Sequence, residues 1–306
     1  MSEPDADVDA GRYTVPGLER GLRILAEFSR TEATLTGAEL ARRLGAPRST
    51  VFRLLMTLES MSFVERTNDG RAFRLGVAVL RLGFEYLNSQ DVTERGRPII
   101  EQLRNATGHP VNLVVRDERE IVYIQRAIVA SPFSGAVSIG TRLPAHATVL
   151  GQVLLSRQSL SQLRRLYPEA QLERFGPNTP TTAAALFELA QAIRRCGFGI
   201  SEGAYEAHIS TIAAPVFDET GQVIAAIGLT VPGGMIPAVS RDQLVAQTRE
   251  AAARLSALLN YRGSPELPDE PAVRALGKAA PGSNANAARG SSALAAQPQG
   301  SAGKVA

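Results

Sequence analysis

Apolar residues recur at helical spacing in three short segments near the start of the chain. In residues 18–28 they fall three or four positions apart, as on one face of an amphipathic helix. A second helix is predicted to begin at Thr36, because Glu39 follows three positions later and completes a capping box. A third is predicted over residues 47–60, where Pro47 suits the first turn. The apolar face of this third helix is formed by Val51, Leu54, Leu55 and Leu58.

The next segments predict a β-hairpin followed by two more helices. Residues 62–66 and 71–75 are strand-like and enclose an Asp-Gly pair, which is a strong hairpin signal. Residues 76–90 predict a connector helix, and a further helix is predicted over residues 93–106. Three helices and a hairpin in this order are typical of a winged helix-turn-helix, whose third helix enters the major groove of DNA.

Beyond residue 108 the pattern alternates between strands and helices. Strands are predicted over residues 111–117, 120–127, 134–140, 197–202, 208–218 and 222–231. Helices are predicted over residues 147–156, 159–167, 182–196 and 240–260. Tight polar turns join two pairs of these strands, so the predicted sheet is built from hairpins.

These patterns predict an α+β, multi-domain chain in five parts. Residues 16–76 form the winged helix-turn-helix, residues 77–90 the connector helix and residues 91–261 a C-terminal α/β domain. Residues 1–15 are acidic and lack a hydrophobic period, and residues 262–306 are rich in Ala, Gly, Ser and Pro. Both ends are predicted to be disordered tails.

Composition narrows the class of protein. A single cysteine, Cys196, excludes an internal disulfide and a cysteine-based zinc site. No apolar run reaches the roughly 18 residues of a membrane helix, and the acidic start is unlike a secretory signal, which predicts a cytoplasmic location. The net charge is only +3, so DNA binding must depend on a local patch.

Such a patch is present around the third predicted helix. Residues 36–85 contain eight arginines and five acidic residues. This excess of positive charge suits contact with the phosphates of DNA. The outward positions near the start of the helix hold arginine, which can bond guanine, and Ser and Thr, which contact phosphate or base edges. The predicted DNA-binding residues are Arg42, Arg43, Arg48, Ser49, Thr50, Arg53 and Arg71. The alternative is a winged helix that contacts proteins.

Several segments resemble the IclR family of bacterial regulators. They are VPGLERGLRILAEFS, LTGAELARRLGAPRSTVFRLLMTLESMSFVER and FRLGVAVLRLG, with LPAHATVLGQVLLS and GFGISEGAYEAHISTIAAPVFDETGQVIAAIGLTVP in the C-terminal half. The family pattern is matched through Thr50, Arg53, Leu54, Leu55, Leu58, Arg74, Leu75 and Gly76. The resemblance covers about residues 16–260. The chain departs from it at Ser62-Phe63, where the family usually has a glycine, and we expect this to affect the turn only.

The resemblance implies a GAF-like effector domain, with a pocket between the LPAHATVLGQ segment and the last two strands. Carried over by motif position, the effector-binding residues are Leu143, His146, Val149, Leu150, Ser201, Ile209, Thr211, Gly228 and Thr230. Relatives that bind very small oxo-acids have smaller residues at Val149 and Leu150, and often an acid at Ser201 and a cysteine at Thr211. Bulkier walls and neutral hydroxyls here imply an organic or aromatic acid with an apolar portion. Ordinary sheet packing is the alternative.

Other details of the pocket stay open. Arg116, Arg126 and Arg142 are possible partners for the carboxylate of an effector. His146 and His208 flank the region, and His109 lies farther off. The histidines lack the spacing of a metal site.

No sequence pattern indicates an enzyme, a metal or a cofactor. The chain lacks a phosphate-binding glycine loop, a dinucleotide fingerprint and a G-x-S-x-G context. We therefore expect a non-enzymatic regulator with operator DNA and a small-molecule effector as partners. A sensor that does not bind DNA is the other class. The family implies homodimers or tetramers, with the dimer seam along Val79, Leu80, Leu82, Phe84 and Leu87. Effector binding would then shift the connector geometry.

Overall fold

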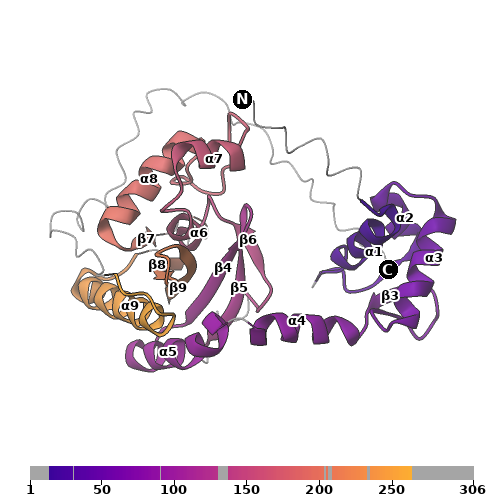
Figure 1. Cartoon of the computed structure of the whole chain (residues 1–306), viewed down its shortest axis with the longest axis horizontal. Helices are drawn as coiled ribbons and strands as arrows, with labels where there is room; N and C mark the ends of the chain where they lie inside the picture. The colour runs from indigo at the N-terminus through magenta and orange to yellow at the C-terminus, as the bar shows by residue number, and fades with distance from the viewer. Residues whose placement is uncertain are drawn as a thin grey trace, which may run out of the picture.

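Two folded units joined by one helix make up the described chain (Figure 1). The structure is a computed structural model that describes residues 14–29, 31–89, 91–129, 137–202, 205, 209–232 and 235–263. The connector is α4 (Ala78–Ser89), where the sequence predicted it. Nearly all of the two predicted tails lies outside the described residues. The mixed helix and strand content and the order of the domains confirm the predicted fold class.

The N-terminal unit holds three helices against a small sheet. The helices are α1 (Pro16–Ala26), α2 (Gly37–Leu44) and α3 (Arg48–Ser60), and the strands are β1 (Leu35–Thr36), β2 (Val64–Arg66) and β3 (Ala72–Leu75). The sheet order is β1-β3-β2, with both pairs antiparallel. The sequence did not predict β1, because two residues before a helix cap are too few to show a period. The shared core is formed by Ile24, Leu40, Val51, Leu55 and Phe73.

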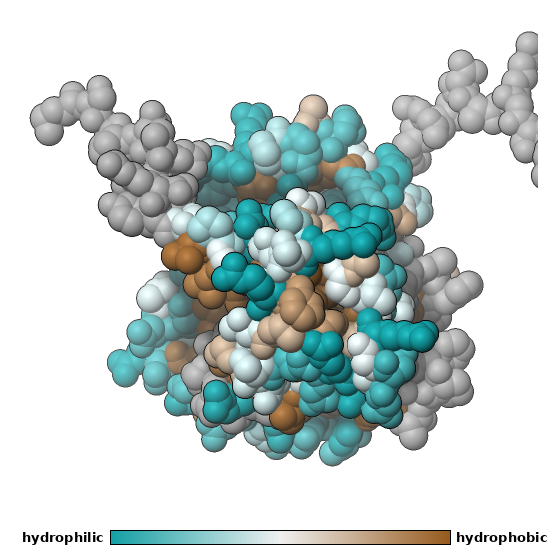
Figure 2. Space-filling model, turned by 90° about the vertical axis from the view of Figure 1, so that its right-hand side faces the viewer, coloured by the Kyte–Doolittle hydropathy of each residue, from teal (hydrophilic) through white to brown (hydrophobic). Residues whose placement is uncertain are grey.

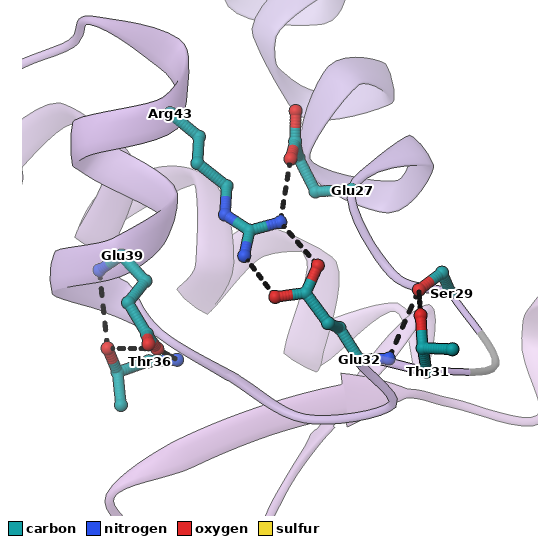
Figure 3. Close-up of polar contacts among 7 residues, drawn as sticks. All are labelled: Glu27, Ser29, Thr31, Glu32, Thr36, Glu39 and Arg43. Atoms are coloured by element: carbon teal, nitrogen blue, oxygen red, sulfur yellow. Dashed lines mark hydrogen bonds and ion pairs between the residues drawn. The ribbon is translucent and has the colours of Figure 1, made fainter. Parts of the chain in front are cut away.

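The start of α2 confirms the predicted capping box. Thr36 Oγ1 accepts a bond from the Glu39 amide at 3.2 Å, and the Glu39 carboxylate accepts one from the Thr36 amide at 2.8 Å (Figure 3). Two amides that the helix itself cannot satisfy are thereby bonded. Gly45 ends the helix in the left-handed region, with φ of 61°. The short second helix is therefore fixed at both ends by local sequence.

The C-terminal unit is a six-stranded antiparallel sheet in the order β6-β5-β4-β9-β8-β7. The strands are β4 (Val111–Asp117), β5 (Glu120–Ala127), β6 (Arg142–Pro144), β7 (Gly199–Glu202), β8 (Ile209–Phe217) and β9 (Val223–Pro232). One predicted strand is misplaced. In the segment 134–140, residues 139–140 form a turn, with Gly140 at φ of 86°, and residues 134–136 lie outside the described residues. The strand follows the turn, as β6.

Helices cover both faces of this sheet (Figure 1). They are α5 (Asp91–Thr107), α6 (Val149–Leu154), α7 (Leu160–Leu166), α8 (Ala183–Cys196) and α9 (Ala238–Leu258). One buried cluster joins α5 and α9 to one face of the sheet through residues such as Ile100, Leu113 and Leu255. A second cluster joins α6, α7 and α8 to the other face through Val153, Leu163 and Leu186. Each face of the sheet therefore has its own apolar core.

Two apolar helix faces lack cover inside the described chain. Leu18 and Leu22 of α1 are 63% and 59% exposed, so only the Ile24 side of the predicted apolar face packs inward. Leu80 and Leu82 of α4 are each 57% exposed. Of the predicted seam, the side chains of Phe84 and Leu87 lie outside what the structure describes.

The turn between α3 and the β2–β3 hairpin, which is the wing of the winged helix, holds a serine in a conformation that favours glycine. Ser62 has φ of 61°, a left-handed backbone that crowds the Cβ of an L-residue. Gly76 packs directly against it, since a Cβ on Gly76 would lie 2.2 Å from the Ser62 carbonyl oxygen. The departure from the family pattern at Ser62 thus falls at a strained turn, as expected, and at the end of α3 opposite to its exposed start.

We predict that Ser62→Gly raises the free energy of unfolding of the N-terminal unit by about 0.5–1 kcal/mol, because it relieves left-handed strain at some cost in chain entropy. Urea denaturation of the full chain, followed by circular dichroism, measures the change. Gly76→Ala is the matched control and should lower stability, because its new methyl group meets backbone. A lower midpoint for Ser62→Gly would contradict the strain.

Candidate DNA-binding surface and ligand pocket

The first turn of α3 exposes hydrogen-bonding groups to solvent. Pro47 occupies the N-cap and makes no side-chain cap bond, so the first amides of the helix have no partner within it. The helix dipole adds partial positive charge at the same place, which favours phosphate. Arg48 and Ser49 are exposed there, Thr50 is partly exposed, and exposed Arg53 follows one turn later.

The arginines of the N-terminal unit fall into two groups. One group is paired with carboxylates: Arg23 with Glu19, Arg43 with Glu27 and Glu32, Arg66 with Glu59, and Arg74 with Glu65. The other group is exposed and has no carboxylate partner among the described residues, and it includes Arg42, Arg48, Arg53 and Arg71. These four were all predicted from the sequence to contact DNA.

Arg43 was also predicted to contact DNA, but its guanidinium is already occupied. Nη1 lies 3.3 Å from Glu27 Oε2, and Nη2 lies 2.5 Å from Glu32 Oε1 (Figure 3). The bond to Arg43 holds the pKa of Glu32 below its usual value, and the same bond raises the pKa of Arg43. This side chain ties α2 to the end of α1 and to the loop before β1, so phosphate would have to compete with two carboxylates for it.

Two further details extend the DNA-binding surface. Arg42 and Arg48 line one shallow hollow between α2 and the start of α3, so they lie close together. Phe52 is 54% exposed beside Arg53 and was missed by the sequence analysis. The helical period could have found it, because positions 51, 54, 55 and 58 face inward. Hydrophilic side chains gather over much of this end of the molecule (Figure 2).

A pocket in the C-terminal unit lies against a row of polar side chains on the sheet. Asn112 stands opposite Arg126 in the register of β4 and β5, and Thr230 of β9 stands opposite Thr211 of β8. Ser201 of β7 stands opposite Thr211 in turn. Arg126 Nε donates to Asn112 Oδ1 at 3.0 Å, and Asn112 Nδ2 donates to Thr230 Oγ1 at 3.2 Å. Five neighbouring strands therefore contribute one polar side chain each.

The facing wall is apolar and comes from α6 and from β6. Val149, Leu150 and Leu143 line it. Two glycines of the sheet let α6 approach closely, because a Cβ on Gly228 would lie 2.7 Å from Leu150 and one on Gly199 would lie 2.7 Å from Val149. One polar side and one apolar side are what an amphipathic small molecule requires.

Seven of the nine predicted effector-binding residues line this pocket: Leu143, Val149, Leu150, Ser201, Ile209, Thr211 and Thr230. Gly228 does not, because Leu150 packs over it. His146 does not either, since it is buried nearby with Nε2 2.9 Å from the Glu173 carbonyl oxygen and its ring against Tyr167 and Phe175. His208 lies outside the described residues.

The lining residues that the sequence analysis did not include are Pro110, Asn112, Tyr123, Val137, Thr148 and Tyr205. Of the three arginines left open, only Arg126 is among the lining residues described. Arg142 is paired with Asp117 and Glu120, and Arg116 bonds the Glu118 carbonyl oxygen. Arg126 has no carboxylate partner among the described residues, and burial lowers its pKa.

The described part of the chain contains neither a metal-binding cluster nor a membrane-spanning helix. No group of three His, Cys, Asp or Glu side chains there is arranged to hold a metal ion. Within the same residues, no helix is both long and apolar enough to cross a membrane.

Comparison with family models gives two matches. Residues 17–68 match the IclR helix-turn-helix domain, and residues 84–257 match the model described as Bacterial transcriptional regulator IclR C-terminal. Together the two matches cover α1 to β2 of the N-terminal unit and the six-stranded sheet with its helices.

Curated proteins and solved structures give concordant matches. The chain is 29% identical over 265 residues to the HTH-type transcriptional repressor AllR of Klebsiella pneumoniae, covering 86% of this chain and 94% of that protein. It is 30% identical to the Pca regulon regulatory protein of Pseudomonas putida over 78% of this chain and 81% of that one. A crystal structure of an IclR homolog complexed with 4-hydroxybenzoate, from Microbacterium hydrocarbonoxydans, matches with TM-score 0.69 and 26% identity, covering 80% of this chain and 99% of that chain.

We predict that Arg43→Gln lowers the urea midpoint of the N-terminal unit at pH 7, and that this loss shrinks as the pH falls below 4.5. The pKa of Glu32 is lowered in the folded chain from an ordinary 4.5, so its stabilisation is present above that value and disappears as Glu32 becomes protonated. Arg23→Gln removes a more exposed pair on α1 and serves as the control. A loss that does not change with pH would show that the pairing with Glu32 is not its source.

Proposed function

The chain belongs to the IclR family of bacterial transcriptional regulators, and we propose on this basis that it binds operator DNA through the start of α3 and responds to an organic acid held against the sheet. It has the N-terminal helix-turn-helix domain and the C-terminal effector domain of that family. We place it in the cytoplasm with its DNA and assign it no catalytic step.

The observation that supports the DNA-binding part is the separation of paired from unpaired arginines. Arg48 and Arg53 flank the exposed first turns of α3, where Ser49 and Thr50 can bond phosphate or base edges. Arg42 lies on α2 and Arg71 lies in the turn just before β3, and both would contact the DNA backbone. Phe52 would pack against a thymine methyl group or a sugar.

We propose that the uncovered faces of α1 and α4 are buried in a homodimer. Leu18, Leu22, Leu80 and Leu82 are all more than half exposed, and burying such side chains is worth about 1.5–3 kcal/mol each. A two-fold dimer would present two copies of α3 to two half-sites. Pairing of such dimers through the effector domains would give the tetramer that the family resemblance implies.

The position of Arg126 supports the proposal that the effector is an acid. It lies in the pocket with its guanidinium partly buried and bonded to Asn112, and to the Val137 carbonyl oxygen. A carboxylate there would gain charge-assisted bonds that water supplies poorly to a partly buried cation. Tyr123, Tyr205 and the α6 wall suit a flat apolar remainder, so we propose an aromatic acid. The Microbacterium homolog that is complexed with 4-hydroxybenzoate has the same class of ligand.

A path from the pocket to the DNA-binding unit runs through α5. This helix packs against β4 and β5, which contribute Asn112 and Arg126, and it follows α4 along the chain. A ligand that alters the spacing of these strands would alter α5 and hence the direction of α4. The effector would act by favouring one of two existing arrangements.

We predict that Arg53→Ala and Arg48→Ala each weaken specific DNA binding by about 10-fold or more, because a paired arginine–guanine contact is worth roughly 1–3 kcal/mol. The DNA is the sequence that the unaltered chain selects from a random pool, and affinity is measured by fluorescence anisotropy. Arg74→Ala, whose side chain is paired with Glu65, should change affinity little. Failure to select any sequence would favour a sensor that does not bind DNA.

We predict that Arg126→Gln abolishes the thermal stabilisation of the C-terminal unit by 4-hydroxybenzoate, since bonds to a charged partner are worth roughly 1.5–3 kcal/mol. Arg142→Gln, which removes a guanidinium paired outside the pocket, should respond like the unaltered chain. The neutral 4-hydroxybenzyl alcohol, which lacks the carboxylate, should stabilise none of these three chains. Equal responses of Arg126→Gln and the unaltered chain would contradict the role of Arg126, and no response to benzoates at all would contradict the aromatic acid.

A further inference from the structure

A groove with its own lining residues lies away from the effector pocket. It runs between α9 and the C-terminal ends of α6 and α8, beside the last residues of β8. It shares no lining residue with the effector pocket. Within the described chain it has no occupant.

The groove exists because small side chains and a short strand leave the space unfilled. The face of α9 toward it carries Ala246, Ala253 and Ala257, whose methyl groups cannot reach across. The neighbouring strand β7 ends its pairing opposite Ala213, so residues 214–217 of β8 form an open edge.

This unpaired edge of β8 is poorly suited to pairing with a further strand. Pro215 has no amide hydrogen to donate, and the Phe217 amide already donates to Ser256 Oγ at 2.9 Å. An added strand would therefore find few donors here, and such measures are how proteins protect sheet edges. The occupant that suits the groove is a small molecule and not an extended peptide.

The chemistry of the groove is cationic and aromatic. Arg157, Arg194 and Arg249 line it with a single acid, Glu250, and none of the three arginines has a carboxylate partner among the described residues. The Arg157 guanidinium lies 4.9 Å from the centre of the Phe217 ring. Phe217 stacks on Tyr261 at 4.9 Å between ring centres.

Of the three arginines, Arg249 is the least exposed, so it would gain the most stabilisation from a bound anion. It lies over the Phe198 ring at 6.0 Å, and burial lowers its pKa. A cation that has lost water without gaining a carboxylate is held at a cost in free energy. An anionic group in the groove would supply the bonds that this guanidinium lacks.

We propose that this groove is a second ligand site, for an organic anion in which a carboxylate or sulfonate is joined to a flat apolar group. The anionic group would lie between Arg157 and Arg249. The flat group would pack on Phe217, Tyr261 and the alanines of α9. This site does not depend on the proposed effector pocket, but it too is linked to α5, the helix that follows the connector, because α9 packs against α5.

The probe for the test is 8-anilinonaphthalene-1-sulfonate, whose fluorescence rises on binding, titrated into the full chain. We expect one saturable site per chain, and Arg157→Gln and Arg249→Gln should each weaken it about tenfold. Ala253→Phe should block it, because its ring would fill the groove from an exposed helix position. Arg254→Gln, on the same helix but bonded to Gln102, should bind as the unaltered chain does.

Two sets of outcomes would overturn the proposal. The first is an absence of saturable binding, or equal affinity for Ala253→Phe, Arg249→Gln and the unaltered chain, with circular dichroism confirming that each is folded. The second is binding that appears only in a chain ending at Gly263. Three acids follow that residue in the sequence, at Glu266, Asp269 and Glu270. That result would identify the chain's own carboxylates, and not a free anion, as the occupant.

Discussion

The carboxylate partner of an arginine, or its absence, decides what that arginine does in this molecule. Arg43 joins two helices because Glu27 and Glu32 hold its guanidinium, whereas Arg48 and Arg53 face solvent without such a partner in the described chain. The same distinction recurs in the C-terminal unit, where Arg142 is paired and Arg126 lines a pocket. A net charge of +3 therefore says little about function, since paired cations cancel locally and the remaining ones are placed where an anion can bind.

Local signals made most of the fold predictable. The capping box fixed the start of α2, and turns after β4 and β8 fixed two hairpins, because each depends on residues a few positions apart. The two errors in strand placement, β1 and β6, concern strands of two and three residues. Segments that short hold no hydrophobic period, and their neighbours in the sheet decide whether they become strands.

The ligand pocket was harder to predict because it depends on register. Counting outward from the turn after β4 would place Gln125 opposite Asn112, since Asp117 pairs with Glu120. An irregularity between Leu113 and Val114 shifts the pairing by one and brings Arg126 opposite Asn112 instead. Gly228 shows a related limit, because its importance lies in admitting Leu150 and is invisible without knowing which helix packs there. Phe52 is different, since helical spacing alone places it outward.

The connector α4 also has a mechanical meaning. Its 12 residues form one continuous helix between the two units, a rod of roughly 18 Å at about 1.5 Å per residue. Each residue of a helix also turns the chain by about 100°, so the number of residues in α4 sets the rotational phase between the six-stranded sheet and α3. Inserting one residue would move the units apart only slightly but would turn one of them through more than a quarter of a circle. Length in this segment should therefore tolerate change far less than the identity of its exposed residues does.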